Sequence, residues 1–134
     1  MSVSVRRPVV LIAEDDTIAR RIAAAELAQA GYQVIAYADG FSALEYLAMG
    51  ERADALVTDV HMPGSFDGLF LAIEARSQRP HLPVVYVSGR SVDQAHMVDG
   101  ARFLEKPYRI GALVGALSTA IETVQPDATV ALAR

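Results

Sequence analysis

The sequence contains no cysteine, so disulfide bonds, thiolate metal sites and cysteine-based catalysis are excluded. It also lacks a basic excess, because 12 lysines and arginines stand against 16 aspartates and glutamates, for a net charge of −4. A protein dedicated to nucleic acid normally carries a basic excess or a basic stripe. The charge balance therefore predicts no nucleic-acid partner.

Long apolar runs are missing as well. No stretch approaches the roughly 18 residues that a membrane helix needs. The short apolar run near the N-terminus ends in three acids, whereas a secretory signal needs about 7–15 apolar residues and a small-residue cleavage site. We therefore expect a protein without membrane association that is located in the cytoplasm.

What the chain does have is a regular alternation of short apolar runs and helix-like stretches. Its 134 residues are 52% hydrophobic, which is enough for one domain with its own core. Strands are expected at residues 9–13, 33–38, 55–58, 84–87 and 102–104, and helices at 17–30, just after 39–40, at 69–78 and at 110–121. Apolar strands alternating with helices predict one α/β domain around a parallel sheet that is covered on both faces.

The ends of this pattern and one connection are less regular. Residues 91–98 are at best weakly helical, and residues 125–134 resemble a frayed tail. The expected organisation is a domain over residues 1–125 followed by a C-terminal tail over residues 126–134.

Polar side chains gather where the expected strands end, and ligands of open parallel sheets bind beyond the carboxyl ends of the strands. The residues at these ends are Glu14, Asp15, Asp16, Asp59, Ser88 and Lys106. Crowded carboxylates repel one another unless a cation is present or their pKa values rise. Because the histidines show no ligand spacing, oxygen ligands favour a hard ion, and Mg²⁺ if a phosphoryl group shares the site.

A carboxylate at such a site can itself act as a nucleophile and form an aspartyl-phosphate. The oxygens of that group need neutralising charges and hydrogen-bond donors. Mg²⁺, the ammonium of Lys106 and the hydroxyl of Ser88 suit this task. The remaining acid, Asp16, is expected only to cap the helix that follows it.

Four motifs, LIAEDD, LVTDVHMPG, VVYVSG and FLEKPY, follow in this order at the ends of expected strands. Together they resemble the receiver domain of response regulators in two-component signalling, over residues 9–123. The resemblance implies a flavodoxin-like, doubly wound sheet of five parallel strands in the order 2-1-3-4-5. It also implies a single-domain response regulator, since only about ten residues follow the last helix.

The resemblance implies a role for each residue of the metal and acceptor site. Asp59 would accept the phosphoryl group and bind Mg²⁺. Asp15 would bind Mg²⁺ directly, Glu14 would act through a coordinated water, and the backbone carbonyl of His61 would complete the protein ligands. The donor of the phosphoryl group would be a histidine kinase or a histidine phosphotransfer protein.

Three further residues receive roles from the resemblance. Lys106 would bind the phosphoryl group, and the bond from Lys106 to Pro107 would be cis. Ser88 would take the position of the switch hydroxyl. Phe103 would be the aromatic side chain that changes rotamer when that hydroxyl moves.

The chain departs from the common receiver pattern in two segments. The loop HMPGSFDG is one residue longer than usual, and the stretch from Ser88 to Lys106 is shorter by about one helical turn. We therefore expect a shortened or irregular fourth helix. Receivers commonly signal through the face of helix four, strand five and helix five, so this departure bears on partner choice. A homodimer of this chain would form through the same face.

Two other functions compete with a phosphorylated regulator that is not an enzyme. A phosphatase resembling the haloacid dehalogenases would need a second aspartate two residues after the nucleophile, where this chain has His61, and it would need a substrate cap. A pseudo-receiver would be a folded docking module that is never phosphorylated. For the phosphorylated regulator the output would be a protein contact, a step in a phosphorelay or competition for phosphoryl groups. A pseudo-receiver would act only by docking.

Overall fold

Three strands of the sheet are buried along their whole length because helices cover both of its faces. The computed structural model describes residues 6–64, 66–109 and 111–124. All five residues of β1 (Val9–Ala13), β3 (Ala55–Asp59) and β4 (Val84–Ser88) are buried. By contrast, the residues of β2 (Gln33–Tyr37) and β5 (Arg102–Glu105) are exposed or half-buried, since these are the two outermost strands of the sheet.

The five strands are parallel and lie in the order β2-β1-β3-β4-β5, which confirms the expected flavodoxin-like topology. Successive side chains of a strand point to opposite faces. Leu11 and Ala13 therefore pack into the core on one face, while Val10 and Ile12 pack into the core on the other. The carboxyl ends of β1, β3 and β4 meet at one edge of the sheet, which we call the carboxyl edge; its opposite is the amino edge.

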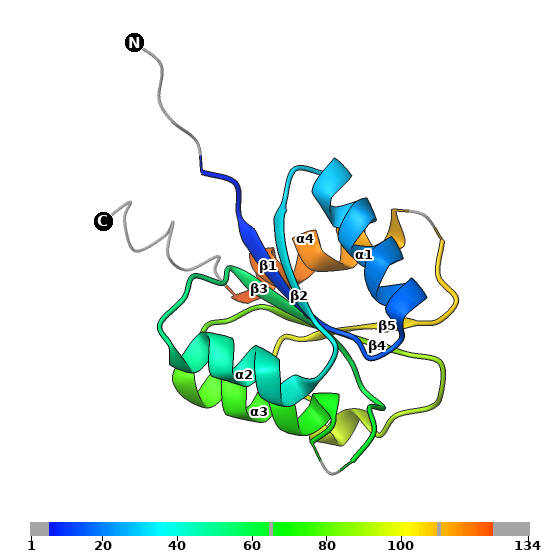
Figure 1. The fold of residues 1–134 in the computed structure, drawn as a ribbon. Coiled ribbons are helices and arrows are strands. Elements are labelled where there is room, and N and C mark those ends of the chain that lie inside the picture. Colours follow the sequence, from blue (N-terminus) through cyan, green and yellow to red (C-terminus); the bar gives the residue numbers. More distant parts are fainter. Residues whose placement is uncertain (1–5, 65, 110, 125–134) are drawn as a thin grey trace.

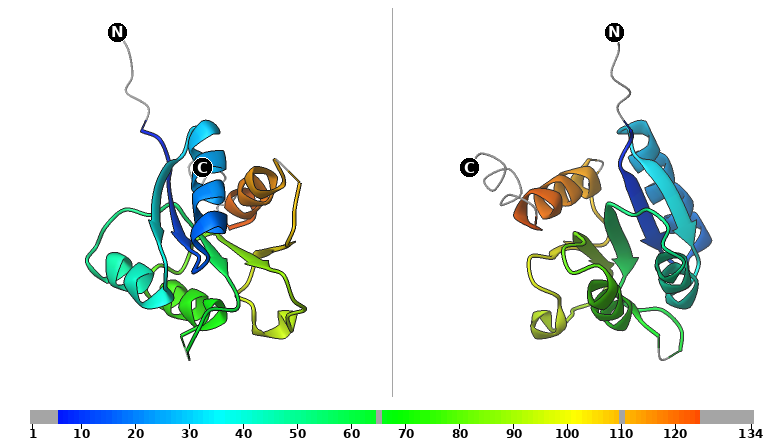
Figure 2. Two further views of the ribbon diagram at one scale, coloured as in Figure 1. Left: turned by 45° about the vertical axis from the view of Figure 1, so that its right-hand side comes forward. Right: turned by 90° about the vertical axis from the view of Figure 1, so that its left-hand side faces the viewer.

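Helices cover the sheet in two pairs (Figure 1 and Figure 2). Helices α2 (Gly40–Ala48) and α3 (Gly68–Gln78) lie on one face, and α1 (Thr17–Gln29) and α4 (Ala112–Val124) lie on the other. Asp16 caps α1 as expected: its side chain accepts a hydrogen bond from the backbone N–H of Ala19. Gly31 follows α1 with a φ of 103°, a left-handed conformation that favours glycine.

The connection between β4 and β5 contains a single 3₁₀ turn, η1 (Gln94–His96), in place of a helix. This agrees with the expected shortened or irregular fourth helix. Two side chains hold the connection: the hydroxyl of Tyr86 accepts from the N–H of Val98 at 3.1 Å, and Arg76 Nη2 donates to the carbonyl of Asp99 at 2.7 Å. Arg76 Nε also donates to the carbonyl of Leu82 at 2.6 Å, so the connection is tied to α3 and to β4.

Element boundaries differ from the expected ones by one to three residues. Asp59 and Ser88 are the last residues of their strands, because they still pair with Val87 and Glu105 of the neighbouring strands. The last helix begins at Ala112 rather than at residue 110. The tail expected over residues 126–134 lies outside the described residues, and no helix in the described part of the chain is long and apolar enough to cross a membrane.

Candidate functional site

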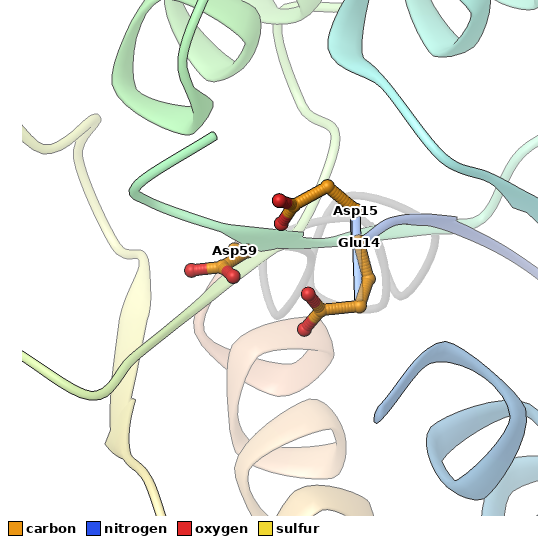
Figure 3. Close-up of side chains that lie close together, drawn as sticks. All are labelled: Glu14, Asp15 and Asp59. Carbon is orange, nitrogen blue, oxygen red and sulfur yellow. The ribbon is translucent and has the colours of Figure 1, made fainter. Parts of the chain in front are cut away.

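Three carboxylates meet at the carboxyl edge of the sheet (Figure 3). Glu14 and Asp15 directly follow β1, and Asp59 ends β3. One oxygen of each lies within 4.8 Å of the others. Glu14 and Asp59 are only 6% and 8% exposed, whereas Asp15 is exposed to solvent. Two carboxylates of the cluster are therefore shielded from solvent, and the third is accessible to it.

Lys106 brings a positive charge to this cluster from the segment after β5. Its Nζ lies 2.7 Å from Oε1 of Glu14 and 3.2 Å from Oδ2 of Asp59. The peptide bond from Lys106 to Pro107 is cis, as the resemblance implies. One ammonium thus bridges two buried carboxylates that would otherwise repel each other.

Burial and charge shift the pKa values of both partners of this ion pair. Burial raises the pKa of Glu14, and the charge of Asp59 adds to this effect, although the hydrogen bond from Lys106 opposes it. For Lys106, burial alone would lower the pKa, but the hydrogen bonds and charges of Glu14 and Asp59 outweigh it and raise the pKa. The ammonium therefore stays charged, but this single positive charge faces the three carboxylates of the cluster.

Ser88 lies beside the cluster, but its hydroxyl is engaged elsewhere. The side chain is fully buried at the end of β4. Its Oγ donates to the carbonyl of Arg90 at 3.0 Å and accepts from the N–H of the same residue at 3.1 Å. Both hydrogen bonds close the turn after β4.

His61 contacts the acid cluster, whereas Phe103 lies in β5 beside β4. The N–H of His61 is 3.3 Å from Oδ1 of Asp59, and its Nε2 is buried without a hydrogen-bond partner among the described residues. Phe103 is half-buried in β5, opposite Tyr86 in the strand pairing, and packs against the core beneath α2 and α3. The structure thus places Phe103 next to β4, on the face opposite α1 and α4.

Comparison with known proteins assigns this arrangement to a family. A family model for the response regulator receiver domain matches residues 10–118. The chain belongs to that family.

Relatives and solved structures agree with this assignment. The chain is 33% identical to the response regulator receiver protein CpdR of Brucella abortus, over 81% of this chain and 92% of that protein. It is 31% identical to the transcriptional regulator NtrC of Escherichia coli, where the match covers 90% of this chain but only 26% of NtrC. A crystal structure of a response regulator receiver protein from Sinorhizobium medicae shares 32% identity and superimposes with a TM-score of 0.84, covering 89% of this chain and 98% of that one.

Membership of the receiver family bears directly on the acid cluster. Receiver domains bind Mg²⁺ at an acidic site, and Glu14, Asp15 and Asp59 form such a site here. The donor set fits a hard divalent cation, since it consists of oxygens, is crowded, and includes a buried carboxylate whose pKa is raised. The individual roles of Ser88 and Phe103, and that of the His61 carbonyl, stay predictions.

Two residues that support the receiver site were missed by sequence reasoning. Arg20 of α1 reaches back, and its Nη1 donates to the backbone carbonyl of Glu14 at 2.8 Å, which holds the loop carrying two of the acids. Gly68 begins α3 so close to β3 that a Cβ there would overlap the backbone carbonyl of Asp59. Only the folded structure brings these pairs together, although glycine at the start of a helix after a long loop is a weak hint of close approach.

Proposed function

We propose that this chain is a phosphorylation-controlled signalling protein whose phosphoacceptor is Asp59. The observation that carries the proposal is the position of Lys106 Nζ, which lies 3.2 Å from Asp59 Oδ2 and also bridges to Glu14. An ammonium in that place can neutralise oxygens of a phosphoryl group on Asp59. The receiver family of the chain supports the same chemistry.

The proposed reaction transfers a phosphoryl group from the phosphohistidine of a histidine kinase or of a histidine phosphotransfer protein. A carboxylate oxygen of Asp59 attacks the phosphorus, an O–P bond forms, and the N–P bond of the donor breaks. The electron pair of the broken bond stays on the donor histidine, which leaves as a neutral imidazole because its other ring nitrogen carries a proton. This chain supplies the nucleophile and the charge of Lys106, whose raised pKa keeps it protonated.

We propose that Mg²⁺ is required, with Asp15 and Asp59 as direct ligands, Glu14 acting through water and the His61 carbonyl completing the set. Bound Mg²⁺ would supply positive charge to the phosphoryl oxygens. The close approach of the three carboxylates supports this ligand set.

We further propose that phosphorylation shifts an equilibrium between two surfaces through Ser88 and Phe103. The Ser88 hydroxyl would leave its hydrogen bonds to Arg90 and turn toward the phosphoryl group. Signalling would then proceed by protein contacts or by a phosphorelay in the cytoplasm. The surface that includes β5 and α4 is the one on which a homodimer is proposed.

The first experiment measures the intact mass of the protein after incubation with Mg²⁺ and acetyl phosphate. A phosphoryl adduct is expected for the wild type, and none for Asp59→Asn or when Mg²⁺ is chelated. Asp99→Asn is a matched control, because Asp99 is exposed and is not one of the acids of the cluster. An adduct of equal yield in Asp59→Asn would overturn the assignment of the acceptor.

The same samples separate the proposal from its two competitors. Catalytic turnover of a phosphate ester, with release of inorganic phosphate in excess over protein, would favour a phosphatase. A pseudo-receiver would show no adduct and no response to beryllofluoride, which mimics a phosphoryl group on an aspartate. The proposal expects a single phosphoryl group per chain and a response to beryllofluoride that is lost in Asp59→Asn.

A further inference from the structure

A cavity of about 420 Å³ opens at the amino edge of the sheet, away from the acid cluster. Its floor is the start of the two strands β1 and β2, where Val9 pairs with Gln33. Figure 1 shows the blue N-terminal segment leading into β1 at this end. Because β1 runs from Val9 to Ala13, just before Glu14, the cavity and the acceptor site are separated by the length of a strand, on the order of 15 Å.

Positive charge dominates the walls of this cavity. Arg6, Arg7 and Arg52 line it together with a single acid, Glu51, although the whole chain has a net charge of −4. Arg52 pairs with Asp54 at 3.0 Å. In the part of the chain that the structure describes, no salt bridge involves Arg6 or Arg7, and both are exposed. Their guanidinium groups are therefore available to an anion.

The wall formed by the loop between α2 and β3 is held in place before any ligand arrives. The hydroxyl of Tyr46 donates to the carbonyl of Arg52 at 2.7 Å. Arg79 Nη2 donates to the carbonyls of Glu51 and Leu47 at 2.8 and 2.9 Å. A site that is already ordered loses less conformational entropy when it binds a ligand.

The chemistry of the lining indicates the class of ligand. Guanidinium groups match the geometry of phosphate oxygens and form paired hydrogen bonds to them. Glu51 can accept hydrogen bonds from hydroxyl or amino groups, and Tyr46 offers an aromatic surface. The volume lies within the range of sites for small organic molecules. We propose that this cavity binds a nucleotide, with its phosphate groups on Arg6, Arg7 and Arg52.

The test measures binding of ATP to the whole chain by calorimetry, in EDTA so that no divalent ion links phosphate to the acid cluster. Saturable binding is expected for the wild type, and the double variant Arg6→Ala/Arg7→Ala should bind about tenfold more weakly. Arg21→Ala/Arg109→Ala is the matched control, because it removes the same charge from exposed arginines outside the cavity. Its affinity should stay close to that of the wild type.

Further arms separate a nucleotide site from other causes of binding. Asp59→Asn should bind ATP as the wild type does, and Arg6→Ala/Arg7→Ala should still accept a phosphoryl group from acetyl phosphate, which shows that it is folded. The proposal is overturned if ATP does not bind, or if both double variants lose affinity equally, since that would reflect net charge alone. It is also overturned if inorganic tripolyphosphate binds as tightly as ATP, or if Asp59→Asn abolishes binding.

Discussion

Two aspartates at the opposite ends of β3 are in contrasting electrostatic environments. Asp54, just before the strand, has its Oδ2 satisfied twice, by the N–H of Val9 at 2.7 Å and by Arg52 at 3.0 Å. Asp59, at the end of the strand, shares one ammonium with Glu14 and faces a third acid. Asp54 links the loop before β3 to the start of β1, and its charge is balanced by Arg52. The charge of Asp59 is only partly balanced, so this carboxylate is suited to bind a cation.

The difference extends to the two edges of the sheet. The carboxyl edge gathers acids around a single lysine, and the amino edge gathers arginines around the start of β1. A chain with a modest net charge can therefore present strong local potentials of opposite sign. Stability arises mainly from the apolar strands between the two edges.

The largest expected effect on stability comes from adding a side chain where α3 begins against the end of β3. Gly68→Ala should lower the free energy of unfolding by about 3 kcal/mol, because the new Cβ overlaps the backbone at Asp59 and Val60. Gly115→Ala is the control: no atom lies near its Cβ position in α4, so it should be neutral or stabilising. Urea denaturation measures both, and equal stability of the two variants would contradict the tight approach of α3 to β3.

The next largest effect is the stability gained from Mg²⁺, which should depend on the carboxyl edge and not on the amino edge. Mg²⁺ at about 100 times its dissociation constant should stabilise the wild type by about 2.7 kcal/mol. It should stabilise Asp59→Asn far less, and it should stabilise Asp54→Asn as much as the wild type. Thermal melts with Mg²⁺ and with EDTA measure this, and an equal gain for Asp59→Asn would place the ion outside the acid cluster.

Neutralising the two aspartates without metal should change stability in opposite directions. Asp54→Asn should cost about 1 kcal/mol, because it weakens a charged hydrogen bond to Val9 and a salt bridge to Arg52. Asp59→Asn should add about 1 kcal/mol, because it removes repulsion within a crowded cluster. Urea denaturation in EDTA gives both values, and a loss in each variant would mean that Lys106 fully compensates the acids.

The smallest expected effect is on the pH dependence of stability, and it arises from Tyr86, which is buried in β4 between the two edges. Burial raises the pKa of Tyr86 in the folded protein above its ordinary value of 10.0. Its contribution to stability is therefore complete below pH 10 and is lost as the pH rises through the folded pKa, since the unfolded state ionises first. The wild type loses stability as the pH rises from neutral to about pH 11. Over this range the loss in Tyr86→Phe should be smaller than the loss in the wild type by about 1 kcal/mol. Parallel curves for the two proteins would contradict this.

The sequence was enough to predict most of the fold, because strands covered on both faces show as unbroken apolar runs. The buried residues of β1 and β4 could be located in this way, and the strand order followed from the family resemblance. The ends of β3 and β4 could not be placed to the residue, since polar Asp59 and Ser88 continue the strand pairing. The amphipathic pattern of the last helix likewise did not show that it starts only after Gly111.

The candidate site divides in a similar way. Three of its residues could be predicted as neighbours because they lie at or just after the ends of strands that finish at the same edge: Glu14, Asp59 and Lys106. The contact of Arg20 with the carbonyl of Glu14 depends on a side-chain conformation that no sequence pattern specifies. The cavity at the amino edge brings together residues that are far apart in the chain, so its charge could not be noticed in advance.

The connection between β4 and β5 shows how a segment that is not a helix can have its backbone groups satisfied. A helix satisfies its own backbone groups, whereas here Tyr86 and Arg76 satisfy the groups of Val98 and Asp99 from outside. The position of the segment consequently depends on side chains of α3 and β4. Because the guanidinium of Arg76 holds both the carbonyl of Leu82 and that of Asp99, removal of this one side chain would release α3 at once from the connection and from the segment before β4.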